Sequence, residues 1–250
     1  ILVPVEPRPT SVTLERGATF TSSVDDVSYT FQTRENFVAS DDGTGSYQFK
    51  TSTGDTAIPV FEGIEREKTF IVGEKTDSQI YVIPDVTMDI STIRVRVFDT
   101  TTGTTFATYT NIKDAVRVTD DSTYYQIKEV PNGYYELIFG DGISSGKAPV
   151  SGNKILVDYL STKGTAANGA TTFTTNVALS VGGNSYPLSA TTSSSSAGGA
   201  FKESIESIRR NAPIAFSSQR RLVTAEDYRA QILANYGSYL DDVIAWGGHD

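Results

Sequence analysis

The sequence predicts a mainly β protein with a small α-containing part at its C-terminal end (α+β), in which several short antiparallel β modules, sandwich- or barrel-like, are joined to two short helices. The 250 residues include 32 Thr, 13 Tyr and 12 Phe but a single Met, a composition that fits the pleated surface of a sheet. Apolar alternations with a period of two run through the first 190 residues. Past residue 200 the period becomes helical.

The first 110 residues predict short strands separated by turn residues. The clearest strand is 93–98, in which Ile93 and Val97 share one face and Arg94 and Arg96 share the other, as on a sheet with one solvated face. The other features expected here are strands around 12–14, 20, 29–31, 47–49, 69–72 and 79–83, and a loop at 41–45.

Residues 111–190 continue this pattern. Pro131-Asn132-Gly133 is typical of a tight hairpin connection, because Asn and Gly accept the positive φ that such turns require. A later alternation places the apolar side chains from Phe173 to Val181 on one face. The strands expected in this part are 115–118, 124–130, 134–139, 154–160 and one within 171–188.

The segment after residue 200 predicts an amphipathic helix. Phe201, Ile205 and Ile208 fall at i, i+4 and i+7. The helix is expected to end at Ala212-Pro213, because the residue before a proline disfavours helical geometry. If Ile208 is buried on this helix, Ile208→Asp destabilises the fold more than Arg210→Asp.

A second helix is predicted by a capping box at 224–227, in which the Thr224 hydroxyl accepts the Asp227 amide. Its apolar side chains include Tyr228 and Tyr236, and Gly237 is the expected stop. A strand is expected to begin at 243–246.

Composition divides the chain into three expected modules: a β-rich module at 1–110, a β module with an F-G-D-G loop at 111–190, and a truncated α-containing module at 200–250. The Ser- and Gly-rich run at 193–199 has nothing to bury. Two interpretations stay open for this run. It is either a hinge, where the backbone bends at little cost, or a surface loop before a helix.

Composition and charge exclude several classes of function. The net charge of −9 disfavours a nucleic-acid partner, because Lys and Arg supply most of that affinity. The chain has no Cys, which excludes disulfides, thiolate nucleophiles and Cys-ligated metals. No stretch approaches the ~18 apolar residues that a membrane span requires. The sequence therefore predicts no enzyme, cofactor, metal, nucleic acid or membrane partner.

The sequence G-I-S-S-G at 142–146 matches the nucleophile elbow of hydrolases, which needs a strand before it and a helix directly after it. Residues 147–152 contain Pro and Gly and are not expected to form that helix. The lone His249 is the one candidate base. We interpret the motif as a loop and predict no catalytic residue.

Four acidic pairs occur along the chain, and none matches the spacing of a calcium-binding loop. Solvated turns are the favoured interpretation, because an Asp side chain bonds the backbone two residues on. Metal binding and carboxylate-based glycoside hydrolysis stay open as alternatives. The pairs are Asp25-Asp26, Asp41-Asp42, Asp120-Asp121 and Asp241-Asp242.

Two arginine pairs, Arg209-Arg210 and Arg220-Arg221, flank Pro213 on this acidic chain. A nucleic-acid site would need a wider basic face with aromatic stacking platforms. Ion pairing within the fold, or with an acidic partner subunit, is the favoured interpretation.

Two blocks of sequence carry a resemblance to a known family. The first is Y-E-L-I-F-G-D-G at 135–142, followed by Pro149, Gly152-Asn153, the alternation Ile155/Val157/Tyr159, Gly164 and Asn168-Gly169. The second is G-G-A at 198–200, I-R-R-N-A-P at 208–213 and R-L-V-T-A-E-D-Y at 221–228. In this order they resemble the signature of the baseplate J-like family of contractile phage tails and related injection machines.

The resemblance implies a structural subunit without catalysis, in several copies joined side by side into a ring around the tail with other baseplate wedge proteins. It also implies assembly in the host cytoplasm, a final location in the tail baseplate of the virion, and a chain that is a C-terminal or central fragment. A carbohydrate-binding β-sandwich tail adhesin stays open as the alternative. That function would need Tyr47, Tyr81 or Tyr134 to be exposed and clustered.

Overall fold

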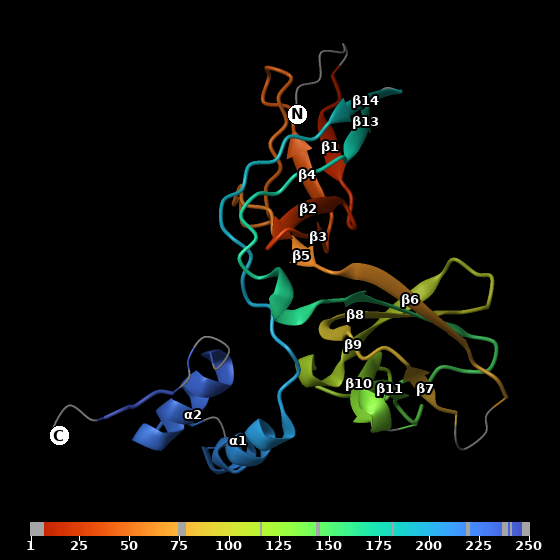
Figure 1. Cartoon of the computed structure of the whole chain (residues 1–250). Helices are drawn as coiled ribbons and strands as arrows, with labels where there is room; N and C mark the ends of the chain where they lie inside the picture. The colour runs from red at the N-terminus through yellow and green to blue at the C-terminus, as the bar shows by residue number, and fades with distance from the viewer. Residues whose placement is uncertain are drawn as a thin grey trace. The chain divides into compact units, whose positions relative to one another are not determined.

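The structure is a computed structural model that describes residues 8–74, 79–115, 117–143, 146–181, 183–218, 221–236, 240 and 242–246. It confirms the predicted fold class, because strands dominate the described chain and its two α-helices lie near the C-terminal end (Figure 1). The chain forms two compact units. Unit 1 comprises Ile1–Lys163 and Ala170–Ser195, and the helical unit comprises Gly164–Gly169 and Ser196–Asp250.

Three small antiparallel sheets belong to unit 1. Their buried side chains include Leu14 and Phe31, and the Phe173 ring lies edge-on to Phe31 with centroids 4.9 Å apart. The paired strands are β1 (Ser11–Leu14) with β4 (Phe37–Ser40), β2 (Thr19–Val24) with β3 (Val27–Gln32) and then β5 (Phe61–Glu62), and β13 (Ala178–Val181) with β14 (Asn184–Pro187).

The main sheet of unit 1 has seven strands in the order β6-β12-β8-β9-β10-β11-β7. All neighbours are antiparallel except β9 and β10, which are parallel. This sheet takes strands from both sides of residue 110, where composition predicts a module boundary. The strands are β6 (Ile64–Ile71), β7 (Tyr81–Ile83), β8 (Met88–Phe98), β9 (Phe106–Asn111), β10 (Tyr124–Val130), β11 (Tyr134–Phe139) and β12 (Lys154–Ser161).

Aromatic rings close this sheet across its two edge strands. Phe70 on β6 lies edge-on to Tyr81 on β7, with ring centroids 5.5 Å apart. Tyr81 in turn packs on Phe139 at 5.5 Å, and Phe139 packs on Tyr109 at 5.4 Å. Around these rings lie fully buried aliphatic side chains, including Ile155. The seven strands therefore wrap around one apolar core as a nearly closed sheet.

The strands expected at 124–130 and 134–139 are confirmed as β10 and β11. The connection between them has Asn132 at φ 72° and Gly133 at φ 74°, the conformation that the Pro-Asn-Gly sequence predicts. Their antiparallel register pairs Val130 with Tyr134.

The strand expected at 115–118 is wrong. Ala115, Arg117 and Val118 are outside any strand, and Val116 lies outside the described residues. The chain turns before this segment in a short 3-10 helix, Ile112–Asp114, whose N-terminal Asn111 side chain accepts the Lys113 amide. Further along the chain, β10 pairs in parallel with the end of β9, with Tyr124 opposite Thr110.

The helical unit contains α1 (Ile205–Ser218) and α2 (Ala225–Tyr236). The predicted end of the first helix is wrong, because α1 continues through Pro213. Proline has no N–H for the carbonyl of Arg209, but both residues are exposed, so water can bond that carbonyl. Phe201 precedes the helix, which begins after Ser204, whose hydroxyl accepts the Ser207 amide.

The predicted capping box of α2 is confirmed. The Thr224 hydroxyl accepts the Asp227 amide at 3.2 Å, and the Asp227 carboxylate accepts the Thr224 amide at 2.9 Å. The expected stop, Gly237, lies outside the described residues. The strand expected at 243–246 is wrong, because no described strand lies beside these residues to pair with them.

Two buried tyrosines make unit 1 sensitive to alkaline pH. Burial raises the pKa of Tyr125 to about 12, and burial together with Asp85 raises the pKa of Tyr159 to about 12. Both pKa values lie above the usual value of 10.0, so the folded state retains protons that the unfolded state releases. The stability that this contributes is full below pH 10 and is lost as pH rises from 10 to 12. We expect Tyr125→Phe to reduce the fall in melting temperature over that range.

Candidate functional site

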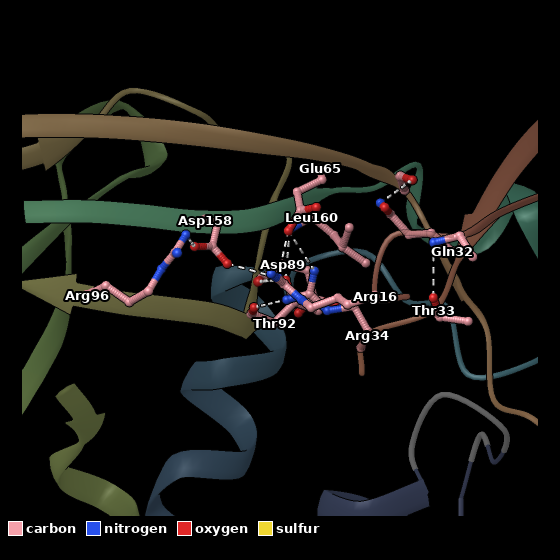
Figure 2. Close-up of polar contacts among 12 residues, drawn as sticks. Arg16, Gln32, Thr33, Arg34, Glu65, Asp89, Thr92, Arg96, Asp158 and Leu160 are labelled. Carbon is pink, nitrogen blue, oxygen red and sulfur yellow. Dashed lines mark hydrogen bonds and ion pairs between the residues drawn. The ribbon is translucent and has the colours of Figure 1, made fainter. Parts of the chain in front are cut away.

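A cluster of arginines surrounds a buried carboxylate in unit 1 (Figure 2). Asp158 on β12 is 1% exposed. Arg96 on β8 donates to one of its oxygens at 2.6 Å, and Arg16, in the turn before β2, donates to the other at 2.8 Å. This carboxylate therefore links the main sheet to the β2–β3 sheet through two charge-assisted hydrogen bonds.

A second carboxylate extends the cluster. Glu65 on β6 lies 2.6 Å from the Arg16 guanidinium and 3.6 Å from that of Arg34. Arg34, which follows β3, also donates to the backbone carbonyl of Thr92. Burial lowers the pKa of Arg34, and the neighbouring charge of Arg16 lowers it further. The cluster thus holds guanidinium groups close together on an acidic protein.

Beside the cluster lies an open depression of about 410 Å³, called the arginine depression below, lined by Arg16, Arg34, Arg94, Ser91 and Thr92 among others. Arg94 is directly opposite Asp158 in the β8–β12 register, so the two residues lie on the same face of the sheet. Among the described residues, Arg94 has neither an ion pair nor a side-chain hydrogen bond. The face that sequence alternation predicts as solvated is instead a charged contact surface.

The first and last glycines of the G-I-S-S-G segment are hydrogen-bonded to each other. The Gly142 amide donates to the Gly146 carbonyl at 2.8 Å, and residues 147–150 are not helical. A Cβ at Gly146 would meet the Tyr124 ring at 2.6 Å, so packing requires this glycine. Ser144, Ser145 and His249 lie outside the described residues. The absence of the following helix agrees with the interpretation of the motif as a loop.

Three of the four acidic pairs contain a carboxylate with a partner. Asp41 and Asp42 each accept backbone amides two residues on, as the turn interpretation predicts, and hydrogen bonds from Thr44 lower the pKa of Asp42. Asp121 lies 3.3 Å from Lys147, and Asp242 binds Arg229 at 2.7 Å. Asp241 lies outside the described residues.

The fourth pair is different. Asp25 and Asp26 form the turn between β2 and β3, called the acidic turn below, with φ of 49° and 63°. Both side chains are exposed, and neither has a hydrogen bond or an ion pair among the described residues. No group of three or more His, Cys, Asp or Glu in the described ranges could hold a metal ion.

Two of the three tyrosines that an adhesin would need to expose are buried, and the third, Tyr134, is half-buried. Tyr47 is 2% exposed and donates its hydroxyl to the Pro9 carbonyl. Tyr81 is 8% exposed in the core. Both rings are used to pack the fold, because each lies on the buried face of its segment.

The Ser- and Gly-rich run coincides with the change from unit 1 to the helical unit, between Ser195 and Ser196. From there the chain is held by residues of the helical unit. Ser196 donates to the Ala167 carbonyl at 2.6 Å, and the Asn168 side chain bonds both the amide and the carbonyl of Gly199. The hinge interpretation stays a prediction.

The helical unit exposes an unusual amount of apolar surface. Ile208 is 44% exposed rather than buried, which corrects the expectation for the face of the first helix. Phe216 is 80% and Trp246 is 74% exposed. Arg209, Arg210 and Arg221 of the predicted basic patch are also exposed, and Arg220 lies outside the described residues. The other large apolar residues exposed here are Phe201, Ile205, Leu222, Val223, Tyr228, Tyr236, Leu240 and Ile244.

The exposed apolar side chains of the helical unit are typical of an interaction surface, because large exposed apolar patches mark such surfaces. Within the described residues, no helix is long and apolar enough to cross a membrane.

No family model matches the chain. The chain is similar to the baseplate wedge protein gp6 of Enterobacteria phage T4, with 28% identity over 93% of this chain. The similarity supports the resemblance that the two sequence blocks carry. The chain spans 36% of the length of that relative.

Proposed function

We propose that the chain is part of a structural subunit of a phage tail baseplate, which associates with further copies of itself and with other wedge proteins in the ring around the tail. The similarity to gp6 over most of this chain is the observation that carries the proposal. It favours a non-catalytic role and a place in the virion tail. Assembly in the host cytoplasm belongs to the same proposal.

The helical unit supports the self-association part of this proposal. Phe216 is 80% exposed and Trp246 is 74% exposed. Aromatic side chains are enriched at the buried centres of protein interfaces. Arginines are also enriched at interfaces, and Arg209 and Arg210 lie exposed on α1 among these residues. A partner that covers this surface removes it from water, which is favourable for apolar area.

Two variants of α1 test this proposal. Because Ile208 and Arg210 are both exposed, Ile208→Asp and Arg210→Asp are expected to change the free energy of unfolding by about 0.5 kcal/mol or less. Sedimentation velocity then measures association. We expect Ile208→Asp to weaken it by about tenfold or more, and Arg210→Asp to weaken it less.

A monomeric wild-type chain at every concentration would contradict the self-association part of the proposal. If the wild type and Ile208→Asp associate equally, α1 is not part of the interface. A large loss of melting temperature in Ile208→Asp alone would restore the original expectation that this side chain is buried.

A further inference from the structure

The β2–β3 hairpin carries opposite charges at its two ends. At the tip, Asp25 and Asp26 hold adjacent carboxylates on a turn in which both residues have positive φ, a conformation that costs energy for residues other than glycine. At the base, Arg16 precedes β2 and Arg34 follows β3. The carboxylates of the acidic turn have no partner among the described residues, so the turn presents free negative charge.

The arginine depression carries positive charge, opposite to that of the acidic turn. Its Arg94 side chain has no ion pair or side-chain hydrogen bond within the described ranges, although it lines the same depression as Arg16 and Arg34. Together with Arg96, these arginines outnumber the nearby acids Asp158, Glu65 and Asp89. Arg34 has one carboxylate neighbour, Glu65, at 3.6 Å, and that carboxylate also pairs with Arg16 at 2.6 Å.

One chain cannot join its own two charged ends. Arg16 and Asp25 are nine positions apart in the sequence, with β2 between them, and an extended chain of that length spans about 30 Å. A contact between turn and depression therefore requires two chains, in which the tip of one meets the base of the next. Such a head-to-tail contact uses two different surfaces of the same protein, and repeated contacts of this type close into a ring when the rotation allows.

We propose that the arginine depression binds the acidic turn of a second copy of this chain. The unpaired Arg94 guanidinium and the partly compensated Arg34 receive the two carboxylates, since an arginine fork matches a carboxylate with paired hydrogen bonds. This inference rests on the proposed self-association and names residues for one contact within it. The contact is electrostatic, and so it is distinct from the apolar surface of the helical unit.

Cysteine cross-linking tests the contact directly, because the chain has no Cys of its own. Val27→Cys places a thiol beside the acidic turn and leaves both carboxylates intact, and Ser91→Cys places one in the depression. Both positions are exposed. Under mild oxidation, a mixture of the two single variants is expected to give a disulfide-linked heterodimer in several-fold excess over a mixture of Ser91→Cys with Ser52→Cys, which lies on an exposed loop elsewhere in unit 1.

A double-mutant cycle with neutralising substitutions measures how much these charges contribute to association. Asn is tolerated at positive φ, so Asp25→Asn with Asp26→Asn removes the charges and keeps the turn. We expect these changes, and Arg94→Gln, each to weaken association by about tenfold, with no further loss when they are combined. Arg117→Gln, at another exposed arginine, is the control and is expected to leave association unchanged.

Heterodimer yields that equal the Ser52→Cys control, or additive losses in the cycle, would overturn the inference. If those results occurred while the wild type still associated through Ile208, the proposed function would stand without this contact. Binding of a hexaglutamate peptide through Arg94 in the absence of the cross-link would assign the depression to a different acidic protein.

Discussion

Asp158→Asn is expected to lower the free energy of unfolding by about 3 kcal/mol, because it leaves the mostly buried Arg96 guanidinium without a carboxylate partner and leaves Arg16 with Glu65 alone. Asp158 is 1% exposed, and the side chains of Arg16 and Arg96, which both bind it, are 21% and 18% exposed. The amide keeps the volume and one acceptor oxygen but supplies N–H donors where both neighbours are donors. Urea denaturation followed by circular dichroism measures the change.

Asp121→Asn is the matched control. This carboxylate also forms an ion pair, with Lys147, but it is 86% exposed, and exposed pairs contribute about 0.2–1 kcal/mol. We expect the control to stay within about 0.5 kcal/mol of the wild type. Equal effects of the two substitutions would contradict the structural role that we assign to the arginine cluster.

Tyr81→Ala is expected to cost about 3–4 kcal/mol, in the range found when a large buried ring is truncated. Tyr81 is buried between Phe70 and Phe139, with both ring centroids 5.5 Å away. Its loss opens a cavity where the two edge strands of the main sheet meet. The measurement is again urea denaturation.

Phe106→Ala gives the comparison for this change. The Phe106 ring also packs on another ring, Phe98, at 5.1 Å, but Phe106 is 42% exposed, so its truncation is expected to cost about 1 kcal/mol. A cost for Tyr81→Ala no larger than that of Phe106→Ala would show that the rings do not hold the sheet closed.

Local sequence was sufficient to predict an element when the residues that determine it all lie within one short segment. The β10–β11 hairpin was predictable residue by residue, because two alternating runs are joined by Pro-Asn-Gly. The start of α2 was predictable for the same reason, since its Thr224 and Asp227 bond each other across one turn. These elements depend little on the rest of the chain.

Where a segment depends on its neighbours, local sequence was not sufficient. Residues 115–118 have strand-like composition, but they follow the turn at Ile112–Asp114, and Ala115, Arg117 and Val118 belong to no strand. Pro213 predicts a helix end, yet α1 continues because an exposed carbonyl can lose its helical partner to water. The spacing of Ile205 and Ile208 correctly indicates an amphipathic helix, but it does not say what covers the apolar face.

The arginine cluster could not be predicted, because its members are far apart in sequence. Arg16 and Asp158 are separated by 142 residues, and no local motif connects them. The alternation of Arg94 and Arg96 on β8 was visible in the sequence, but it predicts a solvated face rather than a charged contact. Only the register of β8 with β12 places Asp158 beside these arginines.

The solution mass of the wild-type chain tests the central claim of self-association most directly. Light scattering over a wide range of concentrations is expected to show a mass that rises above the 27.0 kDa of the single chain as concentration increases. A mass of 27.0 kDa that stays constant up to the highest concentration would contradict an associating surface on this chain.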